Sequence, residues 1–394
     1  MGYVSVQGGT EAIENAEALS RYLRLRGGST PIAVRQIRDQ LSLLVDRVIG
    51  EGGLYAPDLA ALALKQAEGD PIEAAFFLRA YRSTLKRVGD SLPIDSESMR
   101  LSRRISSAFK DIPGGQILGP TPDYRQRILD FDLLHENEDT ARRARTELEE
   151  AIGDGREPLD PSTFTKVVDL LRRQGLAEEI PDTAPPPDSK PAVDITTDSV
   201  TYPLDRSGRL QMMARGETGG LLAIAYSSMR GYGSVHPTIA ELRVGDVEVA
   251  ISHPYRDGET VCIGSLQITE VEIVASTKKE KKPDGSDGKP KFSLGYGCCF
   301  GRNELKAISM ATLDRAMENG TIKVAHGEGT APSEDQEFVL YHTDGIESSG
   351  FCSHFKLPHY VTFQSALDRL RASQRESMDV RSLKRRAAQG AGRD

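Results

Sequence analysis

His354 and His359 form the sharpest local pattern for metal chemistry in this sequence. They are five residues apart, so on a continuous helix of about 3.6 residues per turn their side chains would point roughly 140° away from each other. Pro358 favours a turn instead, and a turn can bring both imidazoles to one ion. Cys352 is close enough in sequence to be a third ligand, although a buried inert thiol is the commoner fate of a cysteine. Two interpretations stay open: an incomplete zinc site, or two hydrogen-bonded histidines near a helix start.

A second candidate is a group of cations and glycines that suits an anionic ligand. Its members are Arg100, Arg103, Arg104, Lys110, Gly114 and Gly115. We expect a helix over 98–110, on which the three arginines would share one face, followed by a turn that the glycines allow. Only Glu97 and Asp111 flank these cations, and such a patch suits a triphosphate. The alternative is a solvated helix face.

Two glycine-containing segments could approach a ligand closely. In Arg230-Gly231-Tyr232-Gly233, Arg230 can hold a phosphate through two hydrogen bonds and Tyr232 can stack on a ring. The alternative is a turn whose tyrosine covers a sheet edge. Gly295-Tyr296-Gly297 is predicted to be a turn before a helix that Asn303 could cap, where free amides could meet a phosphate. Plain packing between a strand and a helix is the alternative there.

The composition limits the class of protein. The chain has 394 residues, 38% hydrophobic and 27% charged, which is typical of a globular protein with two or three domains. Its apolar runs, such as 220–225, are far below the roughly 20 residues of a membrane-spanning helix. The net charge of −8 argues against nonspecific nucleic-acid binding. Four cysteines in a chain of this length predict no disulfide framework, so we expect a cytoplasmic protein.

The elements that must position these residues change in character along the chain. The apolar spacing predicts helices over 36–51, 57–69, 71–89 and 363–372, and alternation predicts strands over 241–251, 261–274 and 338–342. We therefore expect an α+β fold, with an antiparallel sheet and flanking helices after a helical N-terminal region. The expected divisions are a mainly helical domain at 1–180 with a charged insertion at 136–160, a proline-rich linker at 181–200, an α+β domain at 201–373 with a lysine-rich hairpin loop at 276–291, and a disordered basic tail at 374–394.

Six collinear motifs resemble the PhnI subunit family of the bacterial carbon-phosphorus lyase core complex. They are Leu62–Ala67, Leu78–Arg82, Arg103–Ser106, Lys110–Gln116, Arg230–Gly233 and Leu357–Tyr360. The resemblance runs in order from about Val4 to Leu370. It departs at Gln7 and Leu305, which stand where a lysine and an arginine are expected.

The resemblance implies an enzyme subunit of phosphonate catabolism. Such a subunit helps to convert MgATP and an alkylphosphonate into adenine and an α-D-ribose 1-phosphonate 5-triphosphate, and alone it acts as a nucleosidase. The resemblance also implies PhnG, PhnH, PhnJ and PhnL as partner subunits and a two-fold pair of PhnI chains. Two histidines of the family, matching His354 and His359, bind zinc near the PhnJ interface, at a site completed by the neighbouring subunit.

That chemistry assigns expected roles to the residues above. Displacement of adenine from the ribose passes through an oxocarbenium-like state and needs help for the leaving base. We expect Arg103, Arg104 and Lys110 to hold the triphosphate, and Asp111 or His236 to assist adenine. The rival hypothesis is a non-catalytic nucleotide-binding scaffold, because no complete set of catalytic or metal-binding residues is visible in the sequence.

Overall fold

The computed structural model of the protein describes residues 8–125, 127–152, 164–178, 193–233, 235–276 and 289–390. Its contacts form two units, one of residues 33–346 and one of residues 1–32 with 347–394. Within the described ranges, none of the helices combines the length and the apolar composition needed to cross a membrane.

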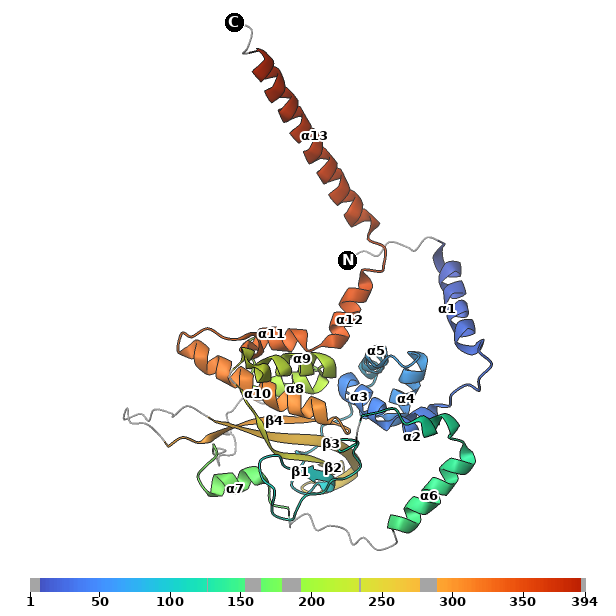
Figure 1. Cartoon of the computed structure of the whole chain (residues 1–394), viewed down its shortest axis with the longest axis vertical. Helices are drawn as coiled ribbons and strands as arrows, with labels where there is room; N and C mark the ends of the chain where they lie inside the picture. The colour runs from blue at the N-terminus through green and yellow to red at the C-terminus, as the bar shows by residue number, and fades with distance from the viewer. Residues whose placement is uncertain are drawn as a thin grey trace. The chain divides into compact units, whose positions relative to one another are not determined.

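A four-stranded antiparallel sheet lies at the centre of the larger unit, in the order β1-β2-β3-β4 (Figure 1). The strands are β1 (Arg100–Ile105), β2 (Thr238–Ser252), β3 (Thr260–Ser276) and β4 (Phe292–Phe300). The strands predicted over 241–251 and 261–274 are thus confirmed as β2 and β3. With its flanking helices this sheet makes the α+β fold that the sequence predicts.

Strand β1 corrects the prediction of a helix over 98–110. Arg104 pairs with Arg243 of β2, and Leu101 with Gly245, so this segment completes the sheet. Pairing with a strand almost 140 residues away in sequence overrides the local helical spacing of the arginines, since propensity is weak against tertiary contacts. Arg103 and Arg104 consequently point to opposite faces of a strand and do not share a helix face.

The glycines of β4 explain how a helix packs closely on the sheet. Gly295 and Gly297, predicted to form a turn, lie inside the strand. A Cβ on Gly295 would lie 2.2 Å from the carbonyl oxygen of Ala311, and one on Gly297 would lie 2.1 Å from that of Ala307. Both carbonyls belong to α10 (Glu304–Ala325). Of the two interpretations, close packing is therefore the one that the structure shows, and no phosphate-binding turn forms at this position.

Helices cover both faces of the sheet (Figure 1). On one side lie α8 (Arg206–Arg215), α9 (Thr218–Ser227), α10 and α11 (Gln336–His342), and on the other side lies α7 (Val167–Arg173). The main core lies between α10 and the apolar sheet face and includes Leu242, Val271 and Ile273. The strand predicted over 338–342 is wrong, since this segment belongs to helix α11. Asp335 caps the start of that helix by accepting a hydrogen bond from the Phe338 amide at 3.0 Å.

A small helical bundle precedes the sheet, as predicted. It consists of α2 (Val34–Gln40), α3 (Ser42–Gly52), α4 (Pro57–Gln66) and α5 (Pro71–Ser83). The helix predicted over 36–51 is divided in two at Leu41. Asp70 caps α5, since its carboxylate accepts from the Ile72 amide at 2.9 Å.

Three short helical turns and one exposed helix complete the described part of the unit: η1 (Phe131–His135), η3 (Ser228–Tyr232), η4 (Pro332–Glu334) and α6 (Glu138–Ile152). Helix α6 has no buried residue, so the charged insertion forms a solvent-exposed helix up to Ile152. The remainder of that insertion, residues 153–160, and residues 181–192 of the linker lie outside the described residues. Because β1 precedes the linker and the other strands follow it, both sides contribute to one sheet.

The smaller unit contains α1 (Gly9–Leu25), most of α12 (Gly345–His354) and α13 (Tyr360–Gly390). Helix α13 includes the helix predicted over 363–372 but continues to Gly390, where the sequence predicted an unfolded tail after 373. Gln7, the hairpin residues 277–288 and residues 391–394 lie outside the described residues.

Candidate functional site

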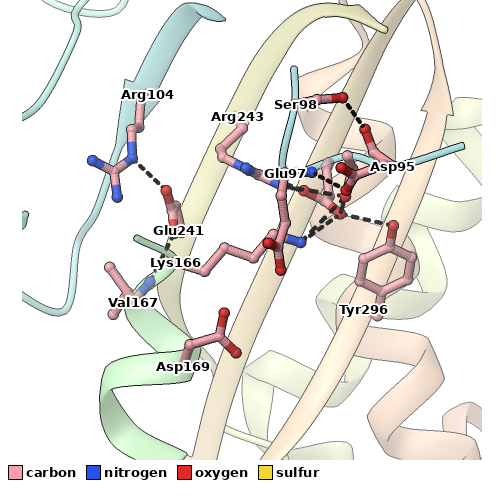
Figure 2. A network of polar contacts seen from close by, with 12 residues as sticks. Asp95, Glu97, Ser98, Arg104, Lys166, Val167, Asp169, Glu241, Arg243 and Tyr296 are labelled. Carbon is pink, nitrogen blue, oxygen red and sulfur yellow. Dashed lines mark hydrogen bonds and ion pairs between the residues drawn. The ribbon is translucent and has the colours of Figure 1, made fainter. Parts of the chain in front are cut away.

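One face of the sheet carries charged and polar side chains in two rows (Figure 2). The first row crosses all four strands as Arg104, Arg243, Glu270 and Cys298, and the second contains Glu241, Glu272 and Tyr296. Alternation along each strand places them on the same side. Lys166 reaches this face from the segment before α7. We call the carboxylates Glu241, Glu270 and Glu272, with their cationic partners, the carboxylate network.

Glu270 is the centre of the network. It is 2% exposed, and its Oε1 accepts hydrogen bonds from Ser96 Oγ at 2.9 Å and from the Tyr296 hydroxyl at 2.9 Å. The Lys166 ammonium lies 3.3 Å from Oε1, and Arg243 Nε donates to Oε2 at 2.9 Å. Burial opposes ionisation, but the charges of Arg243 and Lys166 outweigh it and hold the pKa of Glu270 below its usual value. The carboxylate is therefore a fixed negative charge.

Arg104 has a structural set of partners. Its side chain is fully buried, and its Nε donates to Glu241, which also accepts from the Val167 amide at 2.9 Å. The remaining guanidinium donors reach carbonyl oxygens of the 113–115 turn and of Thr165, the latter at 2.9 Å. Arg104 thus ties two separate segments, the 113–115 turn and residues 165–167, to the sheet.

Arg103 is similarly enclosed on the opposite side of β1. It donates to the Leu118 carbonyl at 2.8 Å and to Asp123 at 2.6 Å, and its Nε lies 3.2 Å from Glu304. Its side chain is 1% exposed. The exposed cationic helix face that the sequence predicted is therefore absent from the described part of the chain. Triphosphate binding by Arg103 and Arg104 stays a prediction.

The other residues predicted from sequence lie at exposed positions on separate segments. Lys110, Asp111, Gly114 and Gly115 occupy the turn after β1, His236 precedes β2, and Arg230 lies on η3, 6.0 Å from the ring of Tyr226. The side chain of Tyr232 lies outside the described residues. Among the described side chains, no hydrogen bond or ion pair joins His236 or Arg230 to the turn.

Glu272 is a carboxyl group that the sequence analysis did not single out. It is partly buried on β3, opposite Tyr296. Burial is the main cause that raises its pKa to about 7. The negative charges of Glu270 and Glu241 raise the pKa further, whereas the positive charges of Lys166 and Arg243 lower it. Such a group exchanges protons near neutral pH, as a general acid must. The sequence does carry a signal for this group, since Glu270 and Glu272 occupy alternate positions of the half-buried strand predicted over 261–274.

We predict that Glu272→Gln stabilises the protein in a pH-dependent way. Because the pKa of Glu272 is raised in the folded state, ionisation of this carboxyl group favours unfolding. The protonated group therefore contributes its full stability below about pH 4.5, and this contribution is lost as the pH rises through about 7. Glutamine does not ionise, so the variant should be more stable than the wild type by about 2 to 3 kcal/mol at pH 8 and nearly equal at pH 5. Urea unfolding at both pH values measures this. A variant less stable at pH 8 would contradict it.

A cavity of about 440 Å³ lies at the β4 edge of the sheet. We call it the β4-edge cavity. Tyr296, Cys298 and Phe300 line it from β4, and residues of α3, α5 and α8 line it from the other side. Its size falls within the range of small-ligand sites. Burial raises the pKa of the Cys298 thiol to about 12, so this thiol stays protonated and is no nucleophile at neutral pH.

The β4-edge cavity combines a cationic part with an apolar part. Arg82 and Arg215 line it, and neither Asp nor Glu occurs among the described residues of its lining. Burial, with the nearby charge of Arg79, lowers the pKa of Arg82, so an anion placed beside Arg82 would relieve that unfavourable environment. Leu266 and Ile268 supply apolar surface. Guanidinium groups match phosphate oxygens in geometry, and apolar walls suit a planar ring.

Two side chains connect the cavity with the carboxylate network. Tyr296, which Figure 2 labels, and Ser96 both line the β4-edge cavity, and both donate hydrogen bonds to Glu270. The fixed charge of Glu270 thus orients two hydroxyl groups at the cavity wall.

In the smaller unit, His354 and His359 lie close together, with ring centroids 5.2 Å apart. Each Nδ1 contacts a backbone carbonyl, that of Phe351 and, at 2.6 Å, that of Leu357. When Nδ1–H donates to a carbonyl, the Nε2 lone pair is left for a metal. Two imidazoles bound tetrahedrally through Nε2 at about 2.0–2.1 Å would have centroids roughly 5 Å apart, so the pair fits zinc.

The histidine pair supplies only part of a metal site. Cys352 is exposed, which argues against the buried inert thiol that the sequence left open. No group of three or more potential metal ligands occurs within the described ranges. A four-coordinate zinc site would need further ligands from elsewhere.

Comparisons with known proteins cover nearly the whole chain. Residues 2–377 match the model of a family described as "Bacterial phosphonate metabolism protein (PhnI)". The chain is 52% identical over 377 residues to the "Putative C-P lyase subunit protein HtxH" of Stutzerimonas stutzeri, covering 95% of this chain and 96% of that protein. It is 46% identical over 376 residues to the "Alpha-D-ribose 1-methylphosphonate 5-triphosphate synthase subunit PhnI" of Escherichia coli, which covers 95% of this chain and 99% of that protein. A Rhizobium meliloti protein of that name is 40% identical to the chain over 400 aligned positions, which cover 100% of this chain and 98% of that protein.

Proposed function

The chain belongs to the PhnI family of bacterial phosphonate metabolism proteins, and from this premise we propose that it transfers the ribose 5-triphosphate of ATP to an alkylphosphonate. A phosphonate oxygen forms a bond to C1′ on the face opposite adenine, and the bond from C1′ to N9 breaks. The electron pair of that bond leaves with adenine, which takes up a proton. Alone, without phosphonate, the chain would act as a nucleosidase that uses water. Mg²⁺ enters as the counter-ion of the triphosphate.

One observation supports this proposal most strongly: the β4-edge cavity joins two arginines to apolar walls, without a carboxylate in its described lining. We assign Arg82 and Arg215 to the triphosphate because they line this cavity, whereas Arg103 and Arg104 do not. The apolar wall would hold the base. Binding both ends in one place would fix C1′ for attack.

Three groups are candidates for assisting adenine. Asp111 and His236 were predicted from the sequence, and Glu272 is added because its pKa of about 7 lets it hold a proton at neutral pH. Removing the acid should lower adenine release by about 10²- to 10⁴-fold. Comparing Asp111→Asn, His236→Asn and Glu272→Gln in the same assay identifies it.

The direct test is to incubate the purified chain with ATP, with and without methylphosphonate, and to measure free adenine by chromatography. The same assay is repeated with PhnG, PhnH, PhnJ and PhnL, which we propose as partner subunits together with a second copy of the chain. Adenine formation supports the proposal. ATP binding without adenine in either preparation would favour the scaffold alternative.

The scaffold alternative also has an observation in its favour. Residues 124–134 expose several large apolar side chains: Tyr124 at 69%, Ile128 at 77%, Leu129 at 78%, Phe131 at 68% and Leu134 at 76%. Apolar surface of this extent is typical of protein–protein contacts. Assembly is compatible with catalysis, so the adenine measurement decides between the two.

We also propose that His354 and His359 hold zinc at a site that a neighbouring subunit completes. Bound zinc would supply Lewis-acid polarisation of an oxygen at that interface. The two imidazoles would hold and orient the ion through Nε2, while their Nδ1 contacts with the Phe351 and Leu357 carbonyls keep each ring in place.

The expected result for His354→Ala with His359→Ala is loss of zinc from the assembled complex. Metal analysis of purified complexes measures the stoichiometry, and thermal unfolding of the variant chain checks the fold. We expect the fold to survive, because both histidines lie at partly exposed positions. Unchanged zinc content would contradict the proposed site.

A further inference from the structure

Lys306 is a buried cation without a hydrogen-bonding partner in the part of the chain that the structure describes. It lies in the first turn of α10 and is 0% exposed, and its Nζ donates no hydrogen bond to any described group. A buried ammonium that makes no hydrogen bond is costly to the fold. An anionic ligand that reached Nζ would supply the missing hydrogen-bond acceptor.

A glycine separates Lys306 from the β4-edge cavity. Gly50, at the end of α3, lines this cavity together with Cys299 and Phe300. A Cβ on Gly50 would lie 3.5 Å from Lys306 Nζ and 3.3 Å from Asn303 Nδ2. The missing side chain of Gly50 therefore leaves the ammonium within contact distance of the cavity wall.

A second glycine repeats this arrangement one turn later. Gly53 also lines the cavity, and a Cβ there would lie 3.2 Å from Nη1 of Arg82 and 3.5 Å from Cγ of Arg215. Two cations, Arg82 and Arg215, thus line the cavity beside Gly53, and a third, Lys306, lies behind Gly50. Convergent cations of this kind match a tetrahedral oxyanion.

We propose that Lys306, reached across Gly50, binds a tetrahedral phosphorus oxyanion in the β4-edge cavity together with Arg82. Identifying the oxyanion as a group of the substrates rests on the proposed function; the binding of an oxyanion does not. Two substrates carry this chemistry, the triphosphate of the nucleotide and the phosphonate itself.

Binding should be coupled to proton uptake. Burial lowers the pKa of Lys306, and so does the charge of Arg79, while Cys299, Glu51 and Glu217 act in the opposite direction. An oxyanion beside Nζ would stabilise the charged form and raise the pKa of Lys306 again. Affinity should therefore fall as the pH rises, and the heat of binding should differ between buffers of different ionisation enthalpy.

The experiment uses the full-length chain and two probes, inorganic triphosphate and methylphosphonate, in titration calorimetry. The variants are Lys306→Met, which keeps the length of the side chain, and Gly50→Ala, which closes the opening without removing the charge. Lys65→Met, on α4, is the matched control. Thermal unfolding checks each fold, and Gly50→Ala keeps the test decisive if Lys306→Met is unstable, since alanine suits a helix.

We expect at least about tenfold weaker binding of one probe in both variants, with proton uptake lost in Lys306→Met. Loss with inorganic triphosphate places the nucleotide's phosphates at Lys306, and loss with methylphosphonate places the phosphonate there. Equal affinity for both probes in wild type, Lys306→Met and Gly50→Ala would overturn the inference. Adenine release by that same wild-type protein would show that the proposed function nevertheless holds.

Discussion

Replacing Arg104 with methionine is expected to lower the free energy of unfolding by about 3 to 5 kcal/mol, because Glu241 would be left as a buried charge without its partner. Arg104 also holds the turn at 113–115 and the Thr165 carbonyl, so these two segments would loosen together. Urea unfolding at neutral pH measures the loss. A change below about 1 kcal/mol would contradict the structural role of this arginine.

A paired substitution controls for the charge. Glu241→Gln added to Arg104→Met removes the unpaired carboxylate and keeps an acceptor for the Val167 amide. We expect this double variant to regain about 1 to 2 kcal/mol over Arg104→Met alone. If Arg104 instead lay free to bind a triphosphate, either variant would retain nearly full stability and lose only ligand affinity.

Replacing Arg82 with glutamine is expected to weaken ATP binding by about 10- to 100-fold and adenosine binding far less. The reason is that a charge-assisted hydrogen bond to a phosphate is lost while the apolar wall of the cavity is kept. Calorimetry with both ligands measures the difference. Arg35→Gln, at an exposed position of α2, is the matched control. Equal losses for ATP and adenosine would show that Arg82 acts on the structure of the cavity and not on the phosphates.

The same titration compares two locations for the triphosphate. The sequence pointed to Arg103, Arg104 and Lys110, whereas the structure favours Arg82. A large, ATP-specific loss in Lys110→Met with none in Arg82→Gln would return the triphosphate to the turn after β1.

Much of the fold could be predicted from periodicity because burial acts locally there. The half-buried strands β2 and β3 alternate clearly, and the bundle helices begin at Pro57 and Pro71, residues suited to a first helical turn. Strand β1 could not be recognised, because its pairing with β2 is a long-range contact and its arginines are spaced as on a helix. In β4, the glycines permit close contact with Ala307 and Ala311 of α10, but in the sequence alone two glycines so close together are typical of a turn.

The candidate site was less predictable for a related reason. Lys306 is a charged residue near the start of a helix, between Leu305 and Ala307, and nothing in its local pattern indicates that it is fully buried. Arg103 and Arg104 look like unbalanced cations in sequence, but Glu241 and Glu304, which neutralise them, come from distant segments. The histidine pair was the exception, since Pro358 lies between its members and the turn is local.

The central claim is that the nucleotide binds in the β4-edge cavity. Photolabelling of the full-length chain with 2-azido-ATP, followed by mass-spectrometric mapping of the labelled peptides, tests it most directly. We predict labelling of the cavity-lining segments around Leu266 and Phe300, reduced by excess ATP and weakened in Arg82→Gln. ATP-protected labelling confined to residues 103–116, with none at the cavity, would contradict this account.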